Sequence, residues 1–215
     1  MNIMRINWKD KSLWALLLAN LVTIFFAVLE NWNFATLLLI FCLQSAIIGF
    51  FNLLKMFTAN VTGEVRIYAP GLAPTKQLKF ARLVLGTFFF FHYGFFMFVF
   101  LASYTWFFMF AVPDTPQKIS EVTLIAFSIM AFFVSHLFSY YNNFIKNKGL
   151  NMDGSELWKL FWFPYVRVIP MNLAILFGWV LFVFFGNQLL MTASLVLKTF
   201  ADIVGYSMEY TRTSK

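Results

Sequence analysis

The chain has 215 residues, of which 61% are hydrophobic, 21% aromatic and 12% charged, and its formal net charge is +7. A globular domain is typically about half apolar and one quarter charged, so this composition excludes an ordinary soluble domain and indicates a polytopic membrane protein. The basic residues stand at the ends of apolar runs, as positive-inside topology predicts, so we expect no nucleic-acid partner. The single cysteine, Cys42, excludes a disulfide framework and a CxxC metal or redox motif.

The first third of the chain predicts two membrane spans followed by a polar connection. Residues 12–29 form the first apolar run, which we expect to be retained because no A-x-A-like cleavage site follows it. The second span covers residues 34–57, after a short turn at 30–33. Residues 58–79 are the long polar connection, in which 65–68 are expected to form a short strand or a surface segment.

The third predicted span, residues 82–106, belongs to the most apolar stretch of the chain. The 31 positions between Arg82 and Asp114 contain no formally charged side chain, and 14 of the 23 residues from Phe88 to Phe110 are aromatic. As a helix, 31 residues would cover about 46 Å, against roughly 30 Å of hydrocarbon. The helix therefore tilts, or its end around residues 104–107 leaves the core; the pattern does not decide whether 103–113 continue the span.

The second half predicts three more spans. The fourth covers residues 122–145, and a polar turn at 151–156 follows with Ser155 as a candidate helix N-cap. Residues 157–163, rich in Trp and Phe, predict a short interfacial helix. Pro164 and Pro170 are expected to interrupt the entry into the fifth span, 168–185, and the sixth covers 189–208. The predicted fold is a single all-α membrane domain: a six-helix transmembrane bundle with a short interfacial helix before the fifth span.

The distribution of basic residues predicts the orientation of these spans. With six spans, fourteen of the sixteen Lys and Arg residues fall on the side of the two termini, while Lys118 falls on the opposite side and Lys198 inside a span. Cytoplasmic loops carry the excess of Lys and Arg. The predicted location is the cell membrane, with the N- and C-termini in the cytoplasm and the lipid bilayer as the surrounding partner.

Every predicted span carries a polar residue in its middle or cytoplasmic half. Lone polar groups facing lipid are unfavourable, so we expect these groups to converge on a common interior that opens, if at all, toward the cytoplasm. The candidate polar centre consists of Asn20, Gln44, Asn52, His92, His136, Asn143, Asn172, Lys198 and Asp202.

Two interpretations of these groups stay open. Lys198 and Asp202, spaced i and i+4, form either an intrahelical ion pair or the wall of a cavity that holds an anionic headgroup or accepts a proton. His92 and His136 either bond neighbouring helices or serve as metal ligands. A zinc site needs three or four donors and carboxylates are scarce, so a bound metal is disfavoured. The sequence contains no HExxH, GxSxG or P-loop motif, so no reaction class follows from motifs.

Several short segments resemble an uncharacterised prokaryotic family of small multi-span integral-membrane proteins, a domain of unknown function. The segments are Ile47 to Met56, Phe91 to Gly94, Ser135-His136 with Asn143, Pro164 to Arg167, and Leu197 to Thr199 with Asp202. The resemblance implies a shared architecture and polar centre. Typical members carry Glu at the position of Gln44 and His at those of Phe100, Asn172 and Tyr206, which implies a membrane-embedded metal site in them. This chain keeps only His92 and His136 of that set.

Three classes of function remain compatible with the sequence. The first is a non-catalytic membrane component, either a subunit of a larger complex or a self-associating scaffold. The second is a membrane-embedded enzyme or metal-binding protein that acts on a lipid, using His92, His136 and Asp202. The third is a small transporter or channel, for which the apolar outer half of the predicted bundle is an obstacle. We expect a homo-oligomer or other membrane subunits as partners in the first class.

Overall fold

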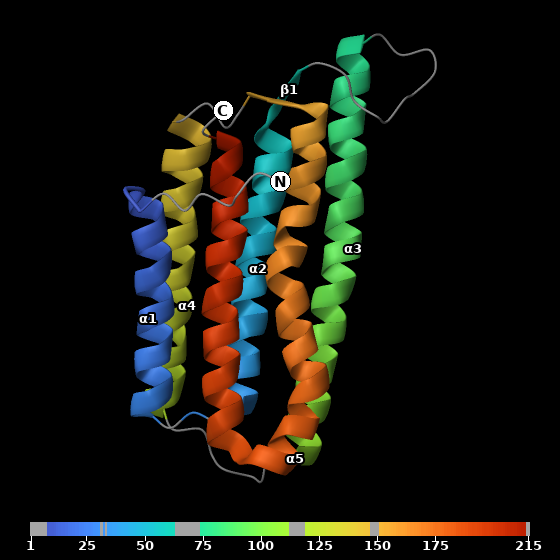
Figure 1. Cartoon of the computed structure of the whole chain (residues 1–215). Coiled ribbons are helices and arrows are strands. Elements are labelled where there is room, and N and C mark those ends of the chain that lie inside the picture. Colours follow the sequence, from blue (N-terminus) through green and yellow to red (C-terminus); the bar gives the residue numbers. More distant parts are fainter. Residues whose placement is uncertain are drawn as a thin grey trace.

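Long helices that run side by side build the protein, as a computed structural model shows (Figure 1). The structure describes residues 8–30, 32, 34–62, 74–111, 119–146 and 151–213. Within these ranges only the backbone is described at 34–35, 74–76, 103, 106–111, 119–121, 167, 170–192 and 208–213. The elements in chain order are α1 (Lys11–Leu29), α2 (Phe34–Thr58), β1 (Asn60–Thr62), α3 (Pro74–Ala111), α4 (Ile119–Ser139), the π-helix η1 (Tyr140–Lys146), β2 (Asn151–Asp153) and α5 (Gly154–Thr213).

Four helices in the described part of the chain are long and apolar enough to cross a membrane. They cover Lys11–Leu29, Thr36–Thr58, Gln77–Ala102 and Val122–Lys146. The mainly helical fold with membrane-length apolar helices is therefore confirmed. The fifth and sixth predicted spans both fall within α5, which folds back on itself as two arms (Figure 1). The beginning of α1 and the end of α5 lie at the same end of the bundle.

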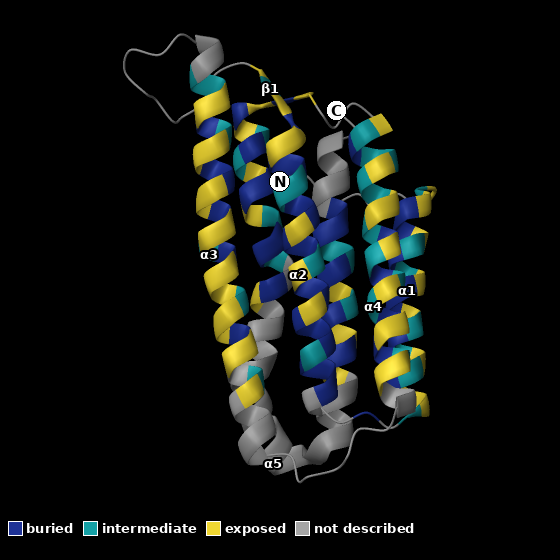
Figure 2. Ribbon diagram, turned by 180° about the vertical axis from the view of Figure 1, so that it is seen from behind, coloured by how far each residue is buried: buried dark blue, intermediate teal, exposed yellow. Residues whose placement is uncertain are grey.

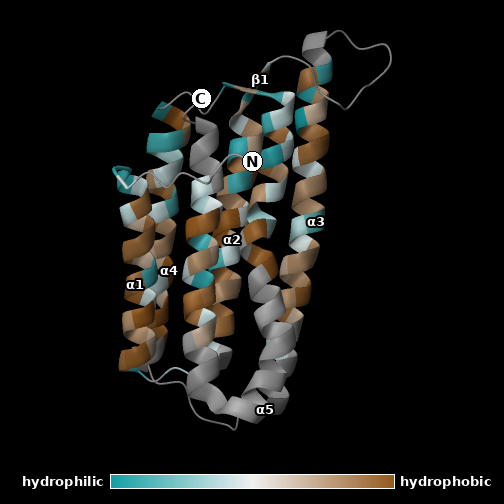
Figure 3. Cartoon of the chain, in the orientation of Figure 1, coloured by the Kyte–Doolittle hydropathy of each residue, from teal (hydrophilic) through white to brown (hydrophobic). Residues whose placement is uncertain are grey.

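Helix α2 holds the bundle together. It contacts α3, α4 and α5, while α1 packs mainly on α4. Its residues are largely buried, whereas α3 exposes most of one side (Figure 2). Hydrophobic residues dominate the middle of the bundle, and hydrophilic residues gather toward the end where β1 lies (Figure 3). In the described part of the chain one end is therefore polar and the middle is apolar, a distribution compatible with a membrane helix bundle.

Helix α3 is longer than the predicted third span. It begins at Pro74, in the segment predicted to be a polar connection, and continues to Ala111. Proline is favourable at the first position of a helix because its missing N–H would have no intrahelical partner there. The prediction of a connection up to residue 79 was therefore wrong, and residues 103–111 do continue the helix. The candidate strand at 65–68 lies outside the described residues.

A two-stranded parallel sheet, not predicted from the sequence, joins the end of α2 to the beginning of α5. Asn60, Val61 and Thr62 pair with Asn151, Met152 and Asp153. Each strand has only three residues, too few for a recognisable alternation of polar and apolar side chains. The sheet forms because tertiary packing brings these two segments together.

The N-cap of α5 is Asp153, not Ser155 as predicted. The Asp153 Oδ1 atom accepts hydrogen bonds from the backbone N–H of Glu156 (2.8 Å) and the hydroxyl of Ser155 (2.7 Å). The Glu156 carboxylate in turn accepts from the Asp153 N–H at 3.1 Å, which completes a capping box. The Ser155 hydroxyl and then the Glu156 N–H lower the pKa of Asp153. The pair Asp153 and Glu156 carries the spacing that could have identified this cap.

Residues 157–163 do not form a separate interfacial helix, and this prediction was also wrong. They belong to the first arm of α5, where Leu157, Leu160 and Phe161 are buried in a core cluster with Leu85 and Phe89 of α3. The high Trp and Phe content suggested the interface, but the spacing of 157, 160 and 161 places these side chains on one helical face. Packing against α2 and α3 therefore decides the position of this segment.

Helices α2 and α3 approach closely at Gly49. The hydroxyl of Tyr93 donates a hydrogen bond to the backbone carbonyl of Ser45 at 2.8 Å, which lays the Tyr93 ring over Gly49. A Cβ atom at Gly49 would lie 2.3 Å from Cε1 of Tyr93. Glycine at position 49 is therefore a packing requirement, as small residues are at other helix interfaces in membranes.

We predict that Gly49→Ala destabilises the protein because the Tyr93 ring is buried and cannot move without losing its hydrogen bond. Overpacking of this kind costs about 1–3 kcal/mol, which heat-denaturation curves of the purified protein in detergent would reveal as a lower melting temperature. Gly94→Ala is the matched control, since nothing lies within 4 Å of its Cβ position. It should leave the melting temperature unchanged or raise it, and equal losses for both variants would contradict a specific packing requirement at Gly49.

Candidate functional site

The two charged residues in the middle of the bundle form a closed triad with Asn20. The Lys198 amino group donates to Oδ2 of Asp202 at 2.6 Å and to Oδ1 of Asn20 at 2.7 Å. The Asn20 amide donates to the same Asp202 oxygen at 2.9 Å. Each of the three residues thus bonds the other two. The triad joins α1 to the second arm of α5, two elements whose triad residues are 178 or more positions apart in the sequence.

The triad is buried, so its two charged side chains need partners inside the protein. Lys198, Asp202 and Asn20 are each at most 3% exposed. The Lys198 amino group also lies 4.7 Å from the centroid of the Phe132 ring, whose face attracts a cation. Removing a charge from water is costly unless it is paired and hydrogen-bonded, and here the two charges bond each other directly. The arrangement stabilises two charges in an apolar interior and ties helices together.

Gln44 lies apart from this triad and bonds α1. Its Nε2 atom donates weakly to Oγ1 of Thr23 at 3.4 Å, and the Thr23 hydroxyl donates to the Ala19 carbonyl at 3.1 Å. The Oε1 atom of Gln44 is buried without a hydrogen-bond partner among the described residues, and the same is true of the Ser128 hydroxyl. Gln44 therefore links α2 to α1 through its Nε2 atom alone.

A second polar cluster, centred on Asp10, lies at the polar end of the bundle. Asp10 is the N-cap of α1 and accepts from the Ser12 N–H at 2.8 Å. Its other oxygen accepts hydrogen bonds from the Tyr206 hydroxyl and, at 3.3 Å, from the Asn143 amide. Asp10 thus joins α1, η1 and α5. The polar-centre prediction included Asn143 but missed Asp10 and Tyr206, although 206 lies one turn beyond Asp202 on the same helical face.

Asn52 solves a backbone problem in α5. Its amide donates to the carbonyl of Leu160 at 2.9 Å. In a regular helix the N–H four residues later would satisfy this carbonyl, but residue 164 is proline and has no N–H. Every backbone polar group in a membrane needs an internal partner. Asn52 supplies it, so α5 continues through Pro164, where the sequence had predicted an interruption.

His92 bonds the first arm of α5. Its Nδ1 atom lies 2.5 Å from the hydroxyl of Tyr165, and the imidazole stacks on Phe88 with 5.3 Å between ring centroids. Phe96, Phe161 and Tyr165 also contact the imidazole ring. Of the two interpretations drawn from the sequence, the hydrogen bond between helices is the one that this geometry shows for His92.

His136 lies on α4, at the polar side of the triad. Its Nδ1 atom lies 3.1 Å from the Phe132 carbonyl, and its ring contacts those of Phe132 and Phe51. It borders two small cavities of about 20 Å3 each, enough for roughly one water molecule apiece. Lys55, which is only 7% exposed, borders both cavities too. The remaining lining residues of the more polar cavity are Ser12, Leu16, Ser135, Ser139 and Tyr206.

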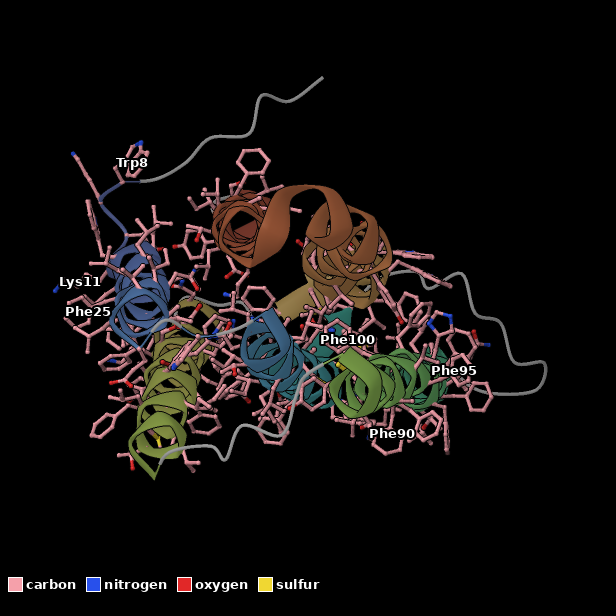
Figure 4. All side chains as sticks on the ribbon, turned by 90° about the horizontal axis from the view of Figure 1, so that it is seen from below. Trp8, Lys11, Phe25, Phe90, Phe95 and Phe100 are labelled. Atoms are coloured by element: carbon pink, nitrogen blue, oxygen red, sulfur yellow. The ribbon has the colours of Figure 1, made fainter. Side chains whose placement is uncertain are left out.

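The structure thus distributes the predicted polar residues over several places. Asn20, Lys198 and Asp202 meet, whereas His92 and His136 stand on α3 and α4, which lie at opposite edges of the bundle (Figures 1 and 4). The side chain of Asn172 lies outside the described residues. In the described part of the chain, no three His, Cys, Asp or Glu side chains are grouped so that they could hold a metal ion.

Comparison with known proteins identifies a family. The model of a family described as "Family of unknown function (DUF6498)" matches residues 2–214. This agrees with the resemblance to an uncharacterised family. No curated protein and no solved structure matches the chain.

We predict that the triad is a coupled unit. Lys198→Met leaves the Asp202 carboxylate buried without its cation and should cost about 3–5 kcal/mol in the free energy of unfolding. Lys198→Met combined with Asp202→Leu removes both charges and should recover much of this loss, as denaturant titration in mixed micelles would show. Exposed Lys79 offers the control, since Lys79→Met should have little effect. Strictly additive losses at 198 and 202 would rule out coupling.

We also predict that the contribution of Asn52 depends on Pro164. Asn52→Ala leaves the Leu160 carbonyl buried and unsatisfied, at a cost of about 1–3 kcal/mol. Pro164→Ala restores a backbone N–H to residue 164, so Asn52→Ala should cost markedly less in that background. Thermal unfolding of the four proteins of this double-mutant cycle measures the difference. If Asn52→Ala costs the same in both backgrounds, the carbonyl is not what Asn52 serves.

Proposed function

This chain belongs to the DUF6498 family, whose function is unknown, and we propose that it is a non-catalytic component of a membrane complex, either a subunit or a self-associating scaffold. The closed triad carries this proposal. The Lys198 and Asp202 charges bond each other and Asn20 and stand in an apolar interior. These bonds attach α1 to α5, which supports a structural role for the two charges.

The proposal includes six membrane crossings, two of them made by α5, and it places the N- and C-termini in the cytoplasm. The support is the charge distribution. Basic residues mark the ends of the helices nearest the β1–β2 sheet: Lys9, Lys11, Lys55, Lys79, Arg82, Lys146 and Lys159. Excess Lys and Arg mark the cytoplasmic side of membrane proteins.

The outer face of α3 supports association within the membrane. Phe90, Phe91, Phe95 and Phe98 are between 57% and 68% exposed. Phe90 and Phe95 point away from the bundle, whereas Phe100 points toward it (Figure 4). Aromatic side chains are enriched in protein interfaces because they offer large, rigid contact areas. This face provides such an area along one edge of the bundle.

One observation favours the second candidate, a membrane-embedded enzyme that acts on a lipid. One of the two small cavities, near the polar end, is lined by Lys55 and His136 together with Ser135 and Ser139. A cation beside an imidazole and hydroxyl groups is a chemically competent combination. A metal-free version of this candidate would use His136 as the base. His136→Gln that leaves folding and assembly intact but abolishes a cellular phenotype would favour it.

Assembly can be tested by photo-crosslinking in cells. A photoreactive residue in place of exposed Phe91 should give a discrete crosslinked product, either a second copy or another membrane protein. The same residue in place of Phe89, which is 1% exposed, provides the matched control and should crosslink within the chain only. A tag at the C-terminus tests the orientation. A protease added on the cytoplasmic side should cleave this tag, and a protease added on the opposite side should not.

Photo-crosslinking should also be tried from two exposed positions on other helices, Phe25 of α1 and Val122 of α4. A monodisperse monomer in mild detergent, together with the absence of crosslinks from Phe91 and from these two positions, would contradict the scaffold and subunit roles. A product from one of these positions alone would locate the interface on that helix.

A further inference from the structure

A long apolar trough runs between α1 and α4 on the outside of the bundle. Its volume is about 500 Å3. Small side chains form its floor, namely Ala15 and Ala19 of α1 and Ala131 of α4. Leu18 and Phe127 stand on its rims and are 61% and 62% exposed. The trough therefore opens outward, away from the core.

The length of the trough corresponds to one leaflet of a bilayer. Its lining extends from Lys11 to Val22 on α1 and from Phe127 to Phe138 on α4. Eleven steps of a helix cover about 16 Å, close to half of a hydrocarbon core of about 30 Å. Water in such a trough would lack polar partners, and unfilled space would lose dispersion contacts along its whole lining. The occupant that fits is an extended hydrocarbon chain.

The polar end of the trough is positively charged. Lys11 lines that end, is exposed, and projects from the outer side of α1 (Figure 4). In the described part of the chain it has no carboxylate partner. Trp8 and Trp14 stand beside it, 57% and 56% exposed, with the Trp14 ring nitrogen donating to the Trp8 carbonyl at 2.8 Å. Tryptophan collects at the level of lipid headgroups, which places Lys11 at that level.

We propose that this trough binds one acyl chain of an anionic phospholipid from the cytoplasmic leaflet, with the phosphate group of the lipid beside Lys11. The proposal rests on the membrane orientation proposed above, but it does not depend on whether the protein assembles with partners. An apolar wall without charge would hold any lipid equally. Lys11 adds attraction for a net negative headgroup, and one basic residue near a membrane surface favours anionic lipid by about fivefold.

Native mass spectrometry of the purified protein tests the proposal with phosphatidylglycerol and phosphatidylcholine that carry identical acyl chains. The protein should retain one phosphatidylglycerol about fivefold more strongly than one phosphatidylcholine. Lys11→Gln should remove this preference. Ala15→Leu fills the floor of the trough and should weaken the retention of both lipids.

Two control variants match these changes. Lys146→Gln removes an exposed basic residue at the same end of the bundle, outside the trough, and Ala102→Leu adds the same bulk at an exposed position of α3. Both should bind lipid as the wild type does. Because Lys11 is exposed, its variant remains informative even if Ala15→Leu fails to fold.

Three results would overturn the proposal. Equal retention of the two lipids, or an unchanged preference in Lys11→Gln, would show that no headgroup site exists at Lys11. Crosslinking from Leu18 or Phe127 to a second copy would show that protein covers the trough. Crosslinking from Phe91 alone would leave the lipid site in place, so failure of the assembly proposal and failure of the lipid proposal are distinguishable.

Discussion

This structure depends on one constraint: polar groups that lie among apolar helices need hydrogen-bond partners within the protein. In hydrocarbon an unsatisfied amide or charge costs several kcal/mol, so each deep polar residue must find another part of the chain. Lys198, Asp202 and Asn20 answer this demand as a triad, and Asn52 answers it for the carbonyl that Pro164 leaves free. In both cases the bond joins segments more than one hundred positions apart. The hydrogen bonds that satisfy these polar groups therefore also determine which helices lie next to each other.

These bonds divide the bundle into regions of different character. In the middle, the two buried charges bond each other and Asn20. The polar end is more open, with small cavities bordered by Lys55 and His136 and with Asp10 joining α1, η1 and α5. The outer surface offers an aromatic face on α3 and a trough on α1 and α4. The proposals of assembly and of lipid binding both concern this surface, whereas the interior bonds hold its helices in place.

Sequence reasoning failed at the places where tertiary packing overrides a local signal. Trp and Phe around residues 157–163 are typical of an interface, yet Leu157 and Leu160 are buried beneath α2 and α3. Pro164 normally ends a helix, yet α5 continues because Asn52 lies opposite. Pro74 predicts a helix break in a polar segment, although proline is equally suited to the first turn. His92 and His136 share a chemistry but not a location, since depth along a helix says nothing about its rotation or its neighbours.

The sequence by itself determined the helical, membrane-length character of the chain, because composition and the length of apolar runs report directly on burial in hydrocarbon. It also placed Lys198 and Asp202 on one face of a helix, since a spacing of four residues brings two side chains close together on any helix, while the structure shows that the two side chains bond each other. Only the tertiary structure decided that Asn20 completes this pair, that Tyr165 meets His92, and that Ala15 and Ala131 lie beneath one trough. Those contacts depend on which helices are neighbours and how each is rotated, and no local pattern in the chain encodes either.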